Sequence, residues 1–450
     1  MTPEKYCKPA DLAKHVHLYL SDKKKNNPRI TMEILTELFE IMNYVSMKTE
    51  EGEMIQVNIV FCEPETQNTS PQADFSSHSW DFMRFEKPLL FNIKNLLKLS
   101  KAADPWSSSI AVYFDQSNKL YIHGMIDQAI HTQSYINHET TSQPDQAGYF
   151  QASIVGIGSL SVMYRFDVIA TLRQNMLVTD FPDVLRYGPV AKEIKLKAKP
   201  QLSLLLSEIQ KFYPELEEEE ITENFITVWR STIARLLIHI KKYHHGGAFL
   251  ISNERNGLDI KYKLEYARLG RAIRKYVLSG AKEAQLANEI GKKQLINREL
   301  YANHYYMGAD HLSAERELKG AIRFIASNSC VDGAILFNGV LAVQGFGTVI
   351  KKIKLPKKVF VARDTQARID ELESKDPKEF GTRHQSMISY CNEHPGTIGF
   401  VVSQDGDIRV IMKIDEKVVV WDNIRTQRII KVAGGKKPSG IKYITKMISN

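Results

Sequence analysis

The chain has 450 residues, of which 43% are hydrophobic and 25% are charged. This composition excludes a disordered or fibrous protein and provides enough apolar material for two or three packed domains. The formal net charge of +8 favours anionic partners, among which nucleotides and nucleic acids are both candidates. The basic residues, however, form short separated groups without interleaved aromatic residues, so we interpret them as solvated surface and do not expect nucleic acid as a partner.

The four cysteines, Cys7, Cys62, Cys330 and Cys391, are widely scattered. They form no CxxC pair, which argues against a disulfide framework or a zinc knuckle. The first twenty residues lack the pattern of a secretory signal, and no window approaches the ~20 apolar residues that a membrane span requires. We therefore expect a cytoplasmic protein without a membrane span.

The N-terminal part of the chain is predicted to be a mixed α+β, sensor-like domain over residues 1–195. Apolar residues at helical spacing predict a helix over 30–47, and alternation predicts a strand over 54–62. Residues 63–79 have the composition of an exposed loop. Two apolar runs at 110–114 and 120–122 predict a hairpin whose turn carries Asp115 and Asn118.

A second α+β unit is predicted over 196–290, with a helix from about 221 to 243 and a short strand after His244, His245, Gly246 and Gly247. The histidine pair could bind a metal or a phosphate, although a loop at the helix end is the favoured interpretation. Strong helix formers over 280–327 predict a helical connector at 291–326. Within it, His311 and Glu315 share a helix face, which is compatible with a metal site but fits a surface or dimer contact better.

The C-terminal region, 327–450, carries the candidate chemistry in three segments. In the first, Asp332, Gly333 and Ala334 open a predicted strand. The small residues allow close approach of a ligand, and the carboxylate can accept a hydroxyl hydrogen bond or coordinate a hard cation. A plain turn before a strand is the alternative.

The second segment, Gly381 to Gln385, reads GTRHQ and enters a predicted helix. A hydroxyl, a guanidinium and an imidazole beside free backbone N–H groups suit a triphosphate, although a capped helix with a surface arginine is an alternative. The third segment, 397–408, is a buried strand that ends in Ser403, Gln404 and Asp405. Ligand contacts commonly lie at such strand ends, and a plain hairpin turn is the competing interpretation.

In this order, DGA opening a strand, GTRH entering a helix and VVS closing the next strand resemble the diadenylate cyclase domain of bacterial second-messenger enzymes over residues 321–425. The upstream part also resembles a sensor region joined to such cyclases. The resemblance implies a mixed β-sheet flanked by helices, so the chain as a whole is expected to be α+β or α/β. It also implies an active nucleotidyltransferase that condenses two ATP molecules into cyclic di-AMP at a homodimer interface.

By the same resemblance, Asp332 would be catalytic and would hold Mg²⁺ or Mn²⁺. The nucleotide would be bound by Gly333, Ala334, Thr382, Arg383, His384 and Ser403.

Two positions depart from the family pattern. Gln385 stands where the family usually has an arginine, and Gln404 stands where many members have an acidic residue. A lost charge-assisted phosphate contact corresponds to about 1.5–3 kcal/mol, so weaker activity is expected. A nucleotide-binding sensor that has lost turnover is therefore the main alternative. A basic nucleic-acid-binding protein with an accidental motif match is a third one.

Overall fold

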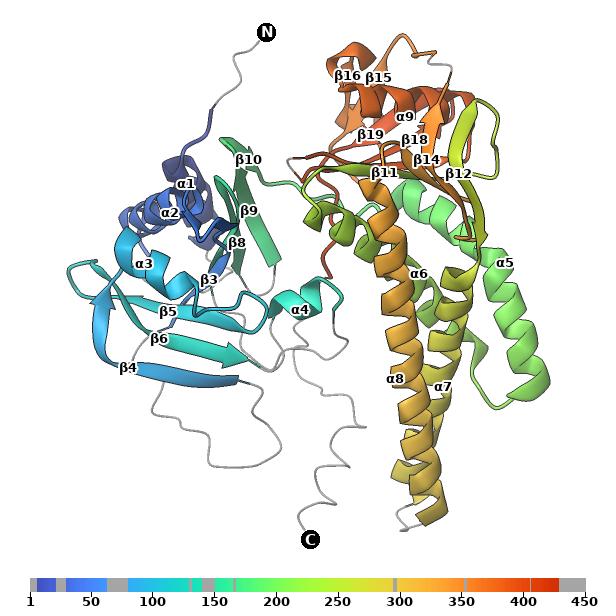
Figure 1. Cartoon of the computed structure of the whole chain (residues 1–450), viewed down its shortest axis with the longest axis horizontal. Coiled ribbons are helices and arrows are strands. Elements are labelled where there is room, and N and C mark those ends of the chain that lie inside the picture. The colour runs from blue at the N-terminus through green and yellow to red at the C-terminus, as the bar shows by residue number, and fades with distance from the viewer. Residues whose placement is uncertain are drawn as a thin grey trace. The chain divides into compact units, whose positions relative to one another are not determined.

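The computed structural model describes residues 6–21, 30–62, 80–128, 132–139, 150–164, 167–293, 298–351, 354–404 and 406–428. These residues divide into two compact units. One reaches to Asp180 and includes residues 427–428, and the other spans Phe181–Thr426. Each unit has its own sheet and core, and each is described by itself below (Figure 1).

The N-terminal unit is built on an eight-stranded sheet in the order β10-β9-β8-β7-β3-β5-β6-β4. Among the described strands of this sheet, β3 and β5 pair in parallel and the other pairs are antiparallel. The strands are β3 (Val57–Phe61), β4 (Trp80–Leu90), β5 (Ser108–Phe114), β6 (Leu120–Gln128), β7 (Gln151–Gly156), β8 (Ser159–Tyr164), β9 (Asp167–Arg173) and β10 (Met176–Val178). A separate two-stranded hairpin joins β1 (Thr49–Glu50) and β2 (Glu53–Met54).

One face of this sheet is covered by α1 (Pro9–Leu20), α2 (Met32–Ser46) and α3 (Ile93–Ser100), while the short α4 (Thr132–Ile136) follows β6 (Figure 1). The N-cap of α2 is Thr31, whose hydroxyl accepts a hydrogen bond from the Ile34 N–H at 3.4 Å. Buried apolar residues of α1, α2 and alternate sheet positions form one core. The predicted helix over 30–47, strand over 54–62 and hairpin at 110–122 are confirmed as α2, β3 and the β5–β6 pair.

The C-terminal unit contains a nine-stranded mixed sheet in the order β12-β14-β13-β11-β17-β18-β19-β15-β16. The pairs β11–β13 and β15–β19 are parallel, and the other pairs are antiparallel. The strands are β11 (Gly247–Ile251), β12 (Leu258–Tyr266), β13 (Ala334–Phe337), β14 (Val343–Ile350), β15 (Val359–Ala362), β16 (Leu372–Lys375), β17 (Ile398–Val402), β18 (Ile408–Ile414) and β19 (Lys417–Trp421).

Helices cover both faces of this sheet. One face packs on α5 (Gly188–Phe212), α6 (Glu218–Lys242), α7 (Arg268–Lys293) and α8 (Arg298–Ser327), of which α7 and α8 form a long antiparallel hairpin (Figure 1). The other face packs on α9 (Thr382–Glu393). The short 3₁₀ turns η3 (Asn328–Cys330), η4 (Ile369–Glu371) and η5 (Pro377–Glu379) precede β13, β16 and α9. The alternation along β11 explains the layering, because Phe249 and Ile251 belong to one core and Ala248 and Leu250 to the other.

The mixed α+β class is confirmed, but the structure divides the chain differently from the prediction. Residues 196–290, 291–326 and 327–450 were expected to be a second unit, a connector and a catalytic domain. Instead, β11 lies between β13 and β17, so the described residues of all three segments share one sheet and one core. The helix α5 also crosses the predicted boundary at 195/196 and contains Pro200. Within the described parts of the chain, no helix is long and apolar enough to cross a membrane.

Candidate functional site

The three candidate segments meet at one end of the nine-stranded sheet. Gly247 at the start of β11 pairs with Val402 at the end of β17, so Ser403 follows at this end. The parallel neighbour β13 is in register with β11 through Phe249 and Ile335, which places Gly333 level with Gly247. Strand order therefore brings Asp332 and Gly333 to the same sheet end as Ser403, although they are about seventy residues apart in the sequence.

The turn before β13 is shaped by Gly333, which has φ +111°. A Cβ on this residue would lie 2.6 Å from the carbonyl carbon of Gly347 and 2.8 Å from the Thr348 nitrogen. Gly333 thus allows β13 and β14 to approach each other, which is a structural reason for a glycine here. Asp332 beside it is exposed, whereas Ala334 is buried as the first residue of β13.

The first turn of α9 begins after Gly381, which provides no side-chain cap. Thr382 and Arg383 are both exposed in this turn. The Arg383 guanidinium lies over the backbone of Gly246: a Cβ on Gly246 would be 2.8 Å from Arg383 Nη1, 2.8 Å from the Val402 carbonyl oxygen and 3.2 Å from the Gln404 nitrogen. The helix start is therefore in direct proximity to the end of β17. A cation beside an uncapped helix N-terminus is an arrangement that favours anions.

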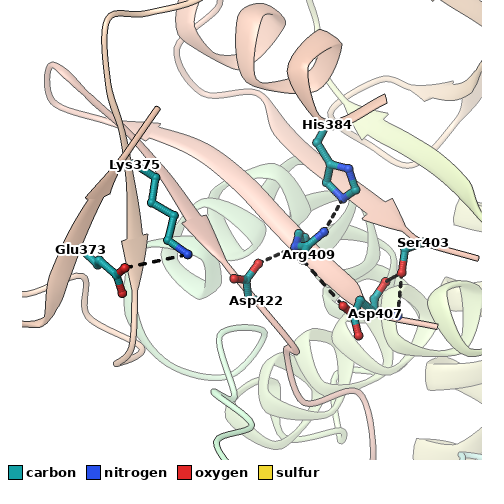
Figure 2. Close-up of polar contacts among 7 residues, drawn as sticks. All are labelled: Glu373, Lys375, His384, Ser403, Asp407, Arg409 and Asp422. Atoms are coloured by element: carbon teal, nitrogen blue, oxygen red, sulfur yellow. Dashed lines mark hydrogen bonds and ion pairs between the residues drawn. The ribbon is translucent and has the colours of Figure 1, made fainter. Parts of the chain in front are cut away.

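His384, by contrast, is turned into the protein and is 8% exposed. Its Nε2 atom lies 3.0 Å from Nη1 of Arg409 on β18 (Figure 2). The same guanidinium contacts Asp407 through Nη2 at 3.7 Å and donates from Nε to Asp422, the residue after β19. Burial, together with the nearby positive charge of Arg409, lowers the pKa of His384 to about 4. His384 is therefore neutral near pH 7.

Gln385 and Gln404, the two departures from the family pattern, differ in their surroundings. The Gln385 amide donates hydrogen bonds to the carbonyl oxygens of Phe380 at 2.6 Å and Lys378 at 3.4 Å, so its two donor hydrogens are used by the turn that precedes α9. Gln404 is exposed at the end of β17. Asp405, the next residue, lies outside the described residues.

Ser403 belongs to the tight turn between β17 and β18. Its hydroxyl accepts a hydrogen bond from the Asp407 N–H at 2.9 Å, and its N–H donates to the Asp407 carbonyl at 2.9 Å. Figure 2 shows this turn beside the Arg409 network, with the Glu373–Lys375 pair of β16 apart from it. The hydroxyl therefore has a local structural partner, and a role in ligand contact would have to be additional.

Among the described residues named at this sheet end, Asp332 is the exposed carboxylate that a divalent cation could use. Among the described residues, no group of three or more histidine, cysteine, aspartate or glutamate side chains is arranged to hold a metal ion. Asp332 alone fits the way Mg²⁺ is commonly held, by one or two carboxylates together with substrate phosphates. It does not fit a site built from protein ligands only.

Three other side chains that the sequence analysis considered, His311, Glu315 and His245, have local partners in the structure. His311 lies against Ser279, with Nδ1 3.1 Å from its hydroxyl, and stacks on Tyr276 at 4.6 Å, while Glu315 pairs with Lys319 at 2.9 Å. These contacts belong to the α7–α8 hairpin and its surface. His245 stacks on Tyr243 at a centroid distance of 6.5 Å, within the loop that ends α6.

Three residues near the site were not singled out from the sequence, namely Gly246 as a partner of Arg383, and Arg409 and Asp422 as partners of His384. Gly246 was visible only as part of a strand entry. Arg409 lies on β18 and Asp422 follows β19, and no motif surrounds either residue. Their proximity to His384 therefore depends on strand order and has no local signal in the sequence.

Comparison with known proteins supports the sensor character of the N-terminal region. A family model described as probable sensor domain DACNV matches residues 24–127. The match lies within the N-terminal unit and ends before the candidate site. No curated protein and no solved structure matches the chain.

Proposed function

We propose that the C-terminal unit binds ATP and acts as a diadenylate cyclase, forming cyclic di-AMP and two pyrophosphates from two ATP molecules. The observation that carries the proposal is the convergence of Asp332, Arg383 and the end of β17 at one sheet end, beside the uncapped start of α9. The sensor-domain match supports it, because this sensor domain belongs to diadenylate cyclase-family proteins.

In this proposal the residues have separate roles. Arg383 and the N–H groups of the first α9 turn bind phosphate oxygens, with Thr382 as a further donor. Gly333 and Ala334 line the nucleoside. Asp332 orients the ribose 3′-hydroxyl that attacks the α-phosphate. A bound Mg²⁺ or Mn²⁺ would be held by Asp332 together with the nucleotide and would supply charge neutralisation at the phosphates.

Cyclisation would require two protomers. Each chain offers one such set of residues, and each ATP must supply both a 3′-hydroxyl and an α-phosphate. We therefore propose a homodimer in which two sites face each other, with the N-terminal sensor unit controlling their alignment. Charge stabilisation and alignment are the main contributions to such a transfer, since pyrophosphate is the leaving group on each side.

The alternative is a nucleotide-binding sensor without turnover. The observation that favours it is the position of Gln385, whose amide is tied to the carbonyl oxygens of Phe380 and Lys378. A neutral side chain held in this way adds no cation to the phosphates.

The two proposals are separated by incubating the purified full-length protein with ATP and Mn²⁺ and analysing the products by mass spectrometry. Cyclic di-AMP that disappears in Asp332→Asn supports the cyclase. Tight ATP binding in calorimetry without any product supports the sensor. Absence of both would reject the nucleotide assignment.

A further inference from the structure

The network around His384 defines which nitrogen of its ring carries the proton. An arginine guanidinium is a donor only, so the ring nitrogen that lies 3.0 Å from Arg409 Nη1 must act as an acceptor. That nitrogen is Nε2. A neutral imidazole with an acceptor at Nε2 carries its hydrogen on Nδ1.

Arg409 is itself fixed by carboxylates on both sides. It contacts Asp407 at 3.7 Å from the turn before β18, and it donates through Nε to Asp422 after β19 (Figure 2). The guanidinium is thus held by two negative charges and one imidazole. It is oriented toward His384 and is not free to move to a phosphate.

The remaining ring nitrogen faces the start of α9. Nδ1 of His384 lies 3.9 Å from the position of a Cβ on Gly381, the N-cap residue. In the part of the chain that the structure describes, this nitrogen has no hydrogen-bond partner. Its N–H is therefore available close to the exposed Thr382 and Arg383, where an anion would also meet the helix N-terminus.

We propose that Arg409 is a positioning residue that fixes His384 as the Nδ1–H tautomer and thereby makes it a neutral hydrogen-bond donor to a phosphate oxygen of the bound nucleotide. The identity of this ligand rests on the proposed function. The orientation of His384 by Arg409 is independent of the proposed function, because it follows from the contact between the two side chains. The network supplies a donor at the first turn of α9 without adding a second cation, and it distinguishes the role of His384 from that of the exposed Arg383.

The tautomer can be measured directly by ¹H–¹⁵N correlation spectra of full-length protein labelled with ¹⁵N-histidine. His384 is identified among the 13 histidines by the signal lost in His384→Gln. We expect a protonated Nδ1, an unprotonated Nε2, and an unchanged signal from pH 8 to about pH 5.5. In Arg409→Met the tautomer should shift toward Nε2–H. Arg363→Met is the matched control, because Arg363 pairs with Glu373 at an exposed site.

Arg409→Lys keeps a positive charge for Asp407 and Asp422, so it tests the contact even if the methionine variant fails to fold. We expect it to lose the fixed tautomer while remaining folded. An Nε2–H tautomer in the wild type, or an unchanged tautomer in both Arg409 variants, would overturn the inference.

Nucleotide binding provides the second readout. Loss of one hydrogen bond to a charged phosphate should weaken ATP binding roughly 10- to 100-fold in the Arg409 variants, while adenosine binding stays unchanged. Equal ATP binding in wild type and variants, despite an altered tautomer, would contradict the phosphate contact. If the wild type shows the Nδ1–H tautomer but binds no ATP, the proposed function fails and the positioning by Arg409 stands.

Discussion

The guanidinium of Arg383 occupies space that only a glycine at position 246 leaves open. Nη1 of Arg383 lies 2.8 Å from where a Cβ of residue 246 would stand, and Gly246 has φ +71°. This relationship links the loop after α6 to the first turn of α9. It places Arg383, the exposed cation of the GTRH segment, beside the end of β17.

Gly246→Ala should displace Arg383 and weaken ATP binding about tenfold or more, because the added methyl group would overlap both Nη1 and the Val402 carbonyl oxygen. Calorimetric titration with ATP measures the effect. Gly257→Ala is the matched control, since Gly257 has φ +80° but nothing lies within 4 Å of its Cβ position. Both variants should lose about 1–3 kcal/mol from backbone strain. Equal ATP affinity in the two variants would contradict the role of Arg383.

Gln385→Arg should strengthen ATP binding roughly 10- to 100-fold by adding a charge-assisted phosphate contact. It should also cost about 1 kcal/mol of folding stability, because the amide's hydrogen bonds to Phe380 and Lys378 are lost. Gln385→Met removes the same hydrogen bonds without adding charge and serves as the control. The prediction is wrong if the arginine and methionine variants bind ATP equally.

Stability of the C-terminal unit should fall as the pH is lowered from about 6.5 to about 4. The pKa of His384 is near 4 in the folded protein and near 6.5 in the unfolded chain, so only the unfolded state takes up the proton in this range. The contribution of His384 to the free energy of unfolding is therefore fully present above pH 6.5 and lost by pH 4. It amounts to about 3 kcal/mol at most. Urea unfolding at several pH values measures it.

The variant His384→Gln should flatten this pH dependence, whereas the exposed His244→Asn should leave it unchanged. Burial also lowers the pKa of His123 in the N-terminal unit to about 4, so the wild type keeps a second pH-dependent contribution. The difference between wild type and His384→Gln isolates the histidine of the candidate site. An identical slope for both proteins would show that His384 is not buried in its neutral form.

Removal of residues 1–180 should leave a folded fragment with altered synthesis rates. The cores around β11 and α9 lie within Phe181–Thr426, and so does every candidate site residue. If the sensor unit restrains dimer alignment, the fragment should make cyclic di-AMP faster, and adding back residues 1–180 should slow it. Equal rates for fragment and full-length protein would reject control by the N-terminal unit. A deletion to residue 280 is unsuitable, because it removes β11 from the centre of the sheet.

Local patterns in the sequence predicted the elements that local chemistry determines. The turn between β5 and β6 is an example, since Asp115 accepts hydrogen bonds from the Ser117 and Lys119 N–H groups and Asn118 has φ +63°. The helix α6 is another, with three glutamates in its first turn and basic residues in its last.

Long-range pairing was not predictable in the same way. The strand β11 resembles any short buried strand, and its neighbours β13 and β17 come from positions about 85 and 150 residues later in the chain. This pairing is why the separate unit expected at 196–290 proved to be part of the large sheet. The contact between His384 and Arg409 depends on the same strand order, whereas the candidate residues Asp332, Thr382 and Arg383 could be named from their motifs alone.

Mass spectrometry of the products that the full-length protein forms from ATP and Mn²⁺ separates a diadenylate cyclase from a protein that only binds nucleotides. We expect cyclic di-AMP and pyrophosphate in a ratio of one to two, with production lost in Asp332→Asn. Absence of cyclic di-AMP from the wild-type protein, or undiminished production by Asp332→Asn, would contradict the proposed cyclase activity.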